Sequence, residues 1–184
     1  MDTFMEKEYP WLVPEKKAIG EYVFNLKKPF LGFCLGCQLL GEVLGGRVVL
    51  SEPPEIGVLD INIIDNANHD PVFNFLPKSI KALQWHSYEV QRLEAINGVK
   101  VIGSSPSTKY QIFGYNNHAY GIQFHIEIRK STVDDWAAVP EYKNALEKSL
   151  GKEALPEMKN SVNQEIDTMM HQCNQLYKNF INII

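Results

Sequence analysis

The stretch PFLGFCLGCQLLGEVLGG, residues 29–46, contains the pattern that decides the fold. After its proline, residues 30–33 form a short apolar run that is typical of a strand buried on both faces. Residues 36–44 then have the composition of a helix that ends at a pair of glycines. The cysteine between these segments, Cys34, therefore occupies a tight turn from a strand into a helix.

Gly32 and Gly36 flank Cys34 at the spacing of a nucleophile elbow, in which the reactive residue lies on a sharp, strained turn. We expect both glycines to leave room for the neighbouring backbone while the cysteine side chain projects into solvent. The helix directs its free N–H groups and positive dipole end at the sulfur, which favours the thiolate. The N–H of Leu35 would face an oxyanion formed on an attacked carbonyl.

The same stretch allows three other interpretations. Cys34 and Cys37 form a C-x-x-C pair, which redox proteins also place at helix N-termini. A zinc site would need Cys173 and scattered histidines to complete four ligands. The two cysteines of the pair can also be buried as small hydrophobic side chains. The turn alone does not choose among these interpretations.

The segment GIQFHIE, residues 121–127, favours nucleophilic catalysis. On an extended backbone, residues two apart point to the same side, so we expect His125 and Glu127 to project together. A nucleophilic cysteine needs a base, and that base needs an acceptor that orients it. A dithiol oxidoreductase has no need of either group. The sequence therefore predicts a triad of Cys34, His125 and Glu127.

The rest of the chain indicates one α/β domain over residues 1–184, with a sheet region at 1–130 and C-terminal helices at 131–184. We expect a mostly parallel sheet with an antiparallel extension. A helix is predicted at 11–26, and one long helix should bury Val162, Ile166, Met169, Met170, Cys173, Leu176, Tyr177 and Phe180. Strands are predicted at 30–33, 47–50, 56–64 with a bulge near 60, 80–85, 99–104, 110–115 and 119–125.

Composition excludes several classes of partner. The net charge of -4 and the absence of a Lys/Arg cluster argue against nucleic acid. No apolar run is long enough to span a membrane, and the acidic N-terminus does not have the order of a signal peptide. Three cysteines without an export signal indicate reduced thiols, so we expect a cytoplasmic protein. No cofactor is predicted.

At its two motifs the sequence closely resembles the class I glutamine amidotransferase family, in particular its GMP-synthase-like members. The family pattern G-x-C-x-G-x-Q appears intact at residues 32–38, and G-x-Q-F-H-P-E appears as GIQFHIE with Ile126 in place of the proline. The segment QWHSYEV, residues 84–90, resembles the family's sequence between these motifs. The resemblance implies a three-layer α/β/α sandwich of flavodoxin-like type.

The resemblance also implies a role for each matching position. Cys34 would attack the side-chain amide of glutamine and form a glutamyl thioester, with His125 as general base and acid and Glu127 orienting it. Leu35 would supply an oxyanion N–H, and Gln38 together with the backbone near Ser87 and Tyr88 would hold the glutamine. His86 is as consistent with a packing or hydrogen-bonding role as with a direct one, and Cys37 is expected to serve in packing.

Family members have about two strands and a Gly-Gly loop before the segment that resembles residues 8–19, and this sequence begins at Met1, shortly before it. We therefore expect that the chain lacks an N-terminal portion, including the loop that donates a second oxyanion N–H. Glutamine hydrolysis with transfer of ammonia to a partner synthase is the predicted function. A γ-glutamyl hydrolase and a catalytically impaired domain that acts as an interaction module, such as a homodimer, are the alternatives.

Overall fold

The structure is a computed structural model that describes residues 2–64, 67 and 69–184. The expectation about the start of the chain falls on Met1, which lies outside the described residues. In chain order the elements are α1 (Leu12–Gly20), the π-helix η1 (Glu21–Asn25), β1 (Phe30–Phe33), α2 (Leu35–Val43), β2 (Arg47–Ile63), β3 (Ser79–Gln91), β4 (Val99–Ser104), β5 (Ile112–Tyr115), β6 (Ala119–Ile122), α3 (Thr132–Ala137), α4 (Pro140–Leu150) and α5 (Ala154–Ile181).

The described strands form one sheet in the order β1-β6-β5-β4-β2-β3. Only β1 and β6 pair in parallel, and the other four pairs are antiparallel. The expectation of a mostly parallel sheet is therefore wrong for these strands. Short connections, such as the turn between β5 and β6, reverse the chain, whereas a parallel pair needs a long crossover. This turn closes a hairpin of β5 and β6, and Asn116 and Asn117 both have positive φ there.

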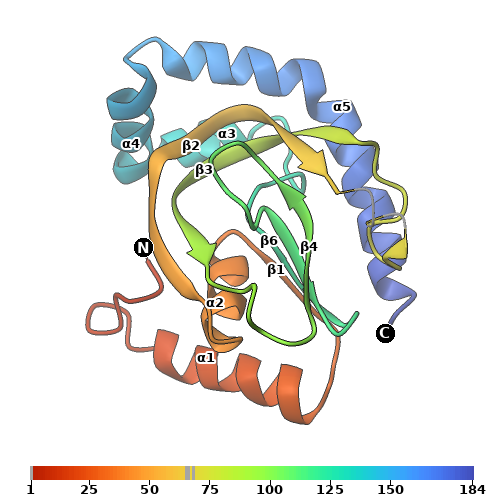
Figure 1. Ribbon diagram of the computed structural model, residues 1–184. Helices are drawn as coiled ribbons and strands as arrows, with labels where there is room; N and C mark the ends of the chain where they lie inside the picture. Colours follow the sequence, from red (N-terminus) through yellow and green to blue (C-terminus); the bar gives the residue numbers. More distant parts are fainter. Residues whose placement is uncertain (1, 65–66, 68) are drawn as a thin grey trace.

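Helices cover both faces of the sheet, so the expected α/β class and its three layers are confirmed (Figure 1). One hydrophobic cluster joins α1 and α2 to one face through residues such as Leu40 and Phe113. A second cluster joins the C-terminal helices to the other face through residues such as Ile112 and Ile166. The adjacent residues Ile112 and Phe113 of β5 enter different clusters because successive strand side chains point to opposite faces.

Several predicted details change in the structure. The strand expected at 80–85 continues to residue 91 as β3, and the helix expected at 11–26 is α1 followed by η1. The strands expected at 47–50 and 56–64 are one strand, β2, and its register shift lies between Leu50 and Glu55 rather than near residue 60. On α5 the exposed fraction is 44% for Met170 and 60% for Tyr177, so these two side chains lie outside the buried face. The other predicted positions on that helix are buried or packed against the core.

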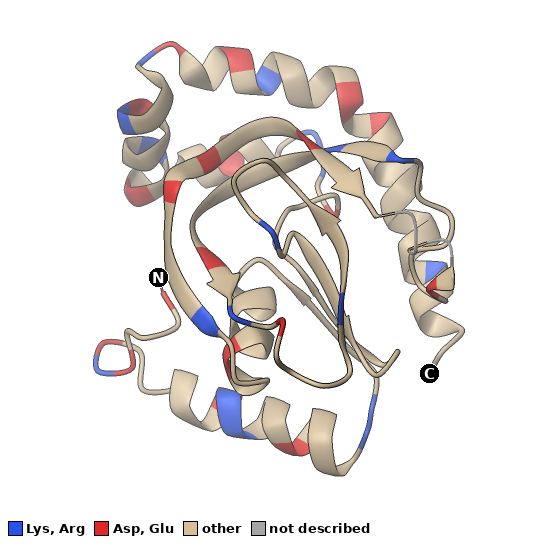
Figure 2. Ribbon diagram, viewed as in Figure 1, with Lys and Arg blue, Asp and Glu red and all other residues tan. Residues whose placement is uncertain are grey.

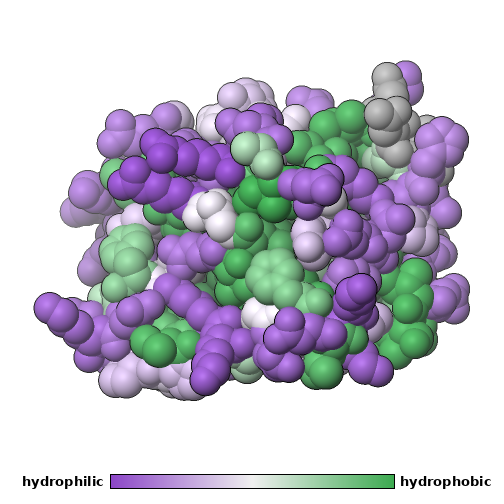
Figure 3. All heavy atoms as spheres, turned by 60° about the horizontal axis from the view of Figure 1, so that its bottom comes forward, coloured by the Kyte–Doolittle hydropathy of each residue, from purple (hydrophilic) through white to green (hydrophobic). Residues whose placement is uncertain are grey.

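The surface carries mixed charge and some exposed apolar residues. Figure 2 shows Lys and Arg distributed over helices, strands and loops among Asp and Glu. Figure 3 turns the end that carries α1 forward and shows apolar side chains gathered across the middle of that face. Exposed apolar residues of α1, η1 and their flanks are Trp11, Val13, Tyr22, Phe24 and Leu26. No described helix is long and apolar enough to cross a membrane.

Candidate active site

Cys34 lies at a strained turn between β1 and α2. Its backbone has φ 45° and ψ -99°, a conformation that side-chain-bearing residues rarely adopt. The parallel pairing of β1 with β6 continues into this turn, because the Cys34 N–H donates to the Ile122 carbonyl at 2.8 Å. The predicted elbow is therefore present, with Cys34 immediately before the first residue of α2.

The two glycines that flank Cys34 have different roles. A Cβ at Gly32 would lie 2.5 Å from the carbonyl carbon and oxygen of Gly36, so a side chain at position 32 would collide with the backbone of α2. A Cβ at Gly36 would meet no atom within 4 Å. The expectation that both glycines leave room for the backbone therefore holds for Gly32 alone.

His125 and Glu127 lie together, as the spacing predicted. The Nδ1 atom of His125 is 2.5 Å from Oε1 of Glu127, whose second oxygen accepts the Ile126 N–H at 2.9 Å. Two backbone hydrogen bonds with Leu83 hold the main chain of His125. The ring of Trp136 packs edge-on against the imidazole with centroids 4.7 Å apart. These contacts fix the orientation of the imidazole ring.

Cys34 and His125 share a hollow of about 250 Å³ that is walled by Phe33, Leu35, Trp85, Trp136 and Tyr142. Burial opposes the charged imidazolium, but hydrogen bonding to Cys34 and Glu127 outweighs it and raises the pKa of His125 to about 9. This shift favours the charged form of the imidazole. This arrangement suits a thiolate nucleophile that is paired with a proton donor.

The residues expected to hold the substrate line a second hollow beside Cys34. This hollow has a volume of about 240 Å³, and Leu35, Gln38, Ser87 and Tyr88 all contribute to it. The Nε2 atom of Gln38 donates to the Tyr88 carbonyl at 2.9 Å and to Oε1 of Gln123 at 3.2 Å. Because both hydrogens of the Gln38 amide are used inside the protein, only its carbonyl oxygen is left for a substrate.

His86 is a buried, hydrogen-bonded residue. Its Nδ1 atom lies 2.9 Å from the Tyr88 carbonyl, and its Nε2 atom lies 3.3 Å from Oε2 of Glu55. Gln123 and Glu55 are two polar residues of the site that were not predicted as functional. Gln123 belongs to the GIQFHIE motif itself, whereas Glu55 follows two prolines and carries no comparable signal.

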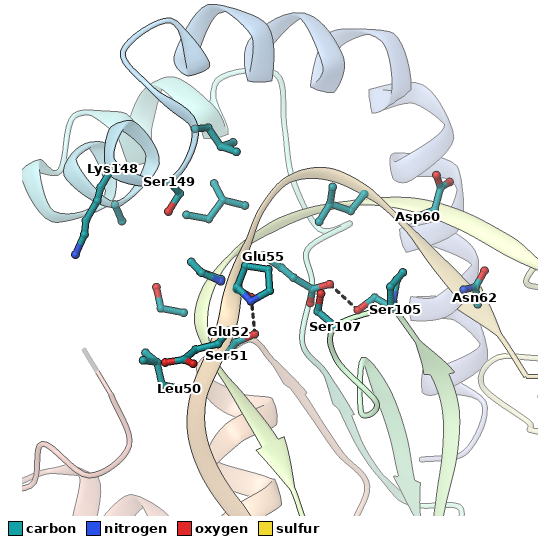
Figure 4. A pocket seen from close by; sticks show the side chains of 18 residues that line it. Leu50, Ser51, Glu52, Glu55, Asp60, Asn62, Ser105, Ser107, Lys148 and Ser149 are labelled. Atoms are coloured by element: carbon teal, nitrogen blue, oxygen red, sulfur yellow. Dashed lines mark hydrogen bonds between the residues drawn. The ribbon is translucent and has the colours of Figure 1, made fainter.

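A larger groove of about 970 Å³ opens next to the second hollow. Ser87 and Ala145 line both spaces, so the groove adjoins the hollow beside Cys34. Figure 4 shows Glu55 and Ser105 joined by a hydrogen bond in its wall, with Lys148 and Ser149 of α4 on the other side. Its remaining lining is largely apolar, including Leu59 of β2.

The state of the three cysteines tests the other interpretations of the C-x-x-C pair, which were a disulfide, a zinc site and packing. All three cysteines are free thiols. Cys37 is fully buried in the cluster beneath α1 and α2, and this burial, together with the nearby Cys34, raises the pKa of its thiol well above the ordinary value. This position agrees with a packing role. Among the described residues, no group of three or more His, Cys, Asp or Glu is placed to hold a metal ion.

Comparison with known sequences gives one family match and several relatives. Residues 6–136 match the family model for glutamine amidotransferase class-I. The chain is 40% identical over 110 residues to one subunit of the glutamine-hydrolysing GMP synthase of Sulfolobus acidocaldarius, covering 59% of this chain and 56% of the relative. The Thermosipho melanesiensis GMP synthase is 38% identical over 122 residues, which cover 65% of this chain and 23% of that protein. The chain thus spans about half the length of the Sulfolobus relative.

Solved structures show the same fold. A glutamine amidotransferase from Thermotoga maritima superposes with a TM-score of 0.84 at 27% identity, covering 98% of this chain and 74% of that chain. A glutamine amidotransferase from Methylobacillus flagellatus gives a TM-score of 0.77 at 23% identity, with 94% and 70% coverage, and supports the fold alone.

Substitution of the two glycines tests the steric account of the elbow. Gly32→Ala should lower the free energy of unfolding by about 1–3 kcal/mol, because the new methyl group collides with the backbone of α2. Gly36→Ala should leave stability unchanged or raise it by about 0.5–1 kcal/mol, since the site is open and helical. Equilibrium urea unfolding measures both. Equal effects of the two substitutions would contradict the account.

Removal of the carboxylate tests the electrostatic contribution of Glu127. Because that charge stabilises the imidazolium, Glu127→Gln should lower the pKa of His125 from about 9 toward its ordinary value of 6.5. An NMR titration of the imidazole measures the shift. Asp135→Asn, which removes an exposed carboxylate on α3, is the control and should leave the titration unchanged. An unaltered pKa in Glu127→Gln would show that the carboxylate does not stabilise the charged ring.

Proposed function

The chain belongs to the glutamine amidotransferase class-I family, and we propose that it hydrolyses the side-chain amide of glutamine through a thioester on Cys34. The observation that carries the proposal is that Cys34 and His125 line the same hollow, where Nδ1 of His125 is held by Glu127. The named relatives are glutamine-hydrolysing synthases, which favours glutamine over a γ-glutamyl peptide as the substrate.

The arrangement supports a reaction in two halves. The Cys34 thiolate attacks the δ-carbon of glutamine, and the N–H of Leu35 at the start of α2 stabilises the oxyanion. The C–N bond breaks as the His125 imidazolium gives its proton to the leaving nitrogen, so ammonia departs and a thioester remains. His125, now neutral, takes a proton from water that attacks the thioester. Glutamate and the thiolate are released, and the imidazolium is restored.

The Gln38 carbonyl oxygen is the group that would contact the substrate from the second hollow. As an acceptor, it suits the α-ammonium group of glutamine. Ser87 and the backbone of Tyr88 complete this side of the hollow. We therefore propose that the amino acid end of the substrate lies near Gln38 and its reacting amide near His125.

The ammonia is proposed to pass to a separate synthase protein. Several relatives are named as one subunit of a GMP synthase, which supports a partner of this kind. The groove that shares Ser87 and Ala145 with the hollow beside Cys34 is the route that we propose for the ammonia. A second copy of this chain is the alternative partner. It would pair with β1, which contacts only β6 among the described strands.

Ammonia release from glutamine tests the proposed function directly. The purified chain should release ammonia and glutamate in equal amounts, and Cys34→Ser should lower kcat by at least about 10³-fold because the thiolate is lost. Cys173→Ala is the matched control and should retain activity, since Cys173 lies on α5 outside both hollows. Hydrolysis that survives in Cys34→Ser would refute the proposal. A chain that folds and releases no ammonia would favour the interaction module.

A further inference from the structure

Gln123 lies between the end of β6 and His125 and is fully buried. Its backbone N–H donates to the Gln111 carbonyl at 2.9 Å, which fixes its main chain. Its side-chain nitrogen, Nε2, lies 3.8 Å from the sulfur of Cys34. A second polar group, besides His125, is thus placed against the sulfur.

The orientation of the Gln123 amide follows from its neighbours. A backbone carbonyl can only accept a hydrogen bond, so the Tyr88 oxygen requires that the Gln38 amide present its nitrogen at this position. The same nitrogen of Gln38 lies 3.2 Å from the side-chain amide of Gln123. Because this nitrogen is a donor, the Gln123 atom that faces it must be the oxygen, Oε1. The nitrogen of Gln123 therefore points the other way, toward the sulfur. Reversal of the amide would set two N–H groups against each other.

The Tyr88 carbonyl also accepts a hydrogen bond from His86. His86 approaches it through Nδ1, so this nitrogen carries a hydrogen, and the other ring nitrogen faces Glu55. Glu55 accepts from Ser105 Oγ at 2.5 Å, which Figure 4 shows, and from Gln111 Nε2 at 2.6 Å.

Burial opposes the charge on Glu55, but hydrogen bonding to His86 and Ser105 outweighs it and lowers the pKa of the carboxyl. The Glu55 carboxyl is therefore ionised at neutral pH. Glu55 and His86 are both buried, with exposed fractions of 4% and 5%.

We propose that Gln123 is a positioning residue for the nucleophile: its amide N–H donates to the sulfur of Cys34, and the chain His86–Tyr88–Gln38 fixes that donor in place. The proposal rests on Cys34 being the nucleophile. The sulfur is a thiolate before it attacks the substrate and again when the thioester breaks. A neutral donor that does not titrate adds to the stabilisation of this thiolate by the His125 imidazolium at both points.

The test is the pH profile of Cys34 alkylation by iodoacetamide in a Cys173→Ala background. Gln123→Met keeps the length of the side chain and removes the donor. We expect the profile to move to higher pH and the alkylation rate at pH 7 to fall about three- to tenfold. Gln84→Met is the matched control, because Gln84 is equally buried and donates to Gln111 without touching the sulfur. It should leave the profile unchanged.

An unchanged profile in Gln123→Met, or equal shifts in both variants, would overturn the proposal. If Gln123→Met does not fold, Gln38→Leu gives the second test, because it frees the Gln123 amide to rotate and should move the profile in the same direction by a smaller amount. No shift in that variant would also overturn it. Alkylation needs no glutamine, so a chain that shows the shift and releases no ammonia refutes the proposed function and leaves this inference standing.

Discussion

The parallel pairing of β1 with β6 is the constraint on which the site depends. It brings two segments about 90 residues apart in sequence into register, with Gly32 opposite Gly121 and the Cys34 N–H bonded to Ile122. The chain then turns sharply, because only a glycine at position 32 allows α2 to lie so close. Cys34 is thereby placed at the start of a helix and beside the segment that carries His125. The position of Cys34 and His125 in one hollow is thus a result of the register of these two strands.

Much of the candidate site could be predicted from the sequence, because the patterns that specify it lie within short segments of the chain. A cysteine between two glycines at a strand-to-helix boundary specifies the turn, and the i, i+2 spacing of an extended backbone brings His125 and Glu127 together. The motifs also identified the family. Most strands could be predicted from runs of apolar residues, because the spacing of apolar residues indicates which side chains are buried.

The features that could not be predicted depend on contacts distant in sequence. The direction of strand pairing is set by connections that the apolar runs do not reveal, so the sheet was expected to be more parallel than it is. Met170 and Tyr177 lie on the exposed side of α5 although their side chains are largely apolar, so the apolar pattern wrongly assigned them to the buried face. Gln123 is within a recognised motif, but its proposed role depends on the orientation of Gln38, which only the fold provides. Glu55 reaches His86 through the pairing of β2 with β3.

The central claim is that the geometry at Cys34 supports covalent chemistry on glutamine, and trapping the intermediate tests it most directly. The purified chain would be mixed with glutamine, quenched in acid within the first turnover, digested and examined by mass spectrometry. We predict a γ-glutamyl adduct on the peptide that contains Cys34, absent in Cys34→Ser. Ammonia release without an adduct, or an adduct on Cys37 or Cys173, would contradict the account.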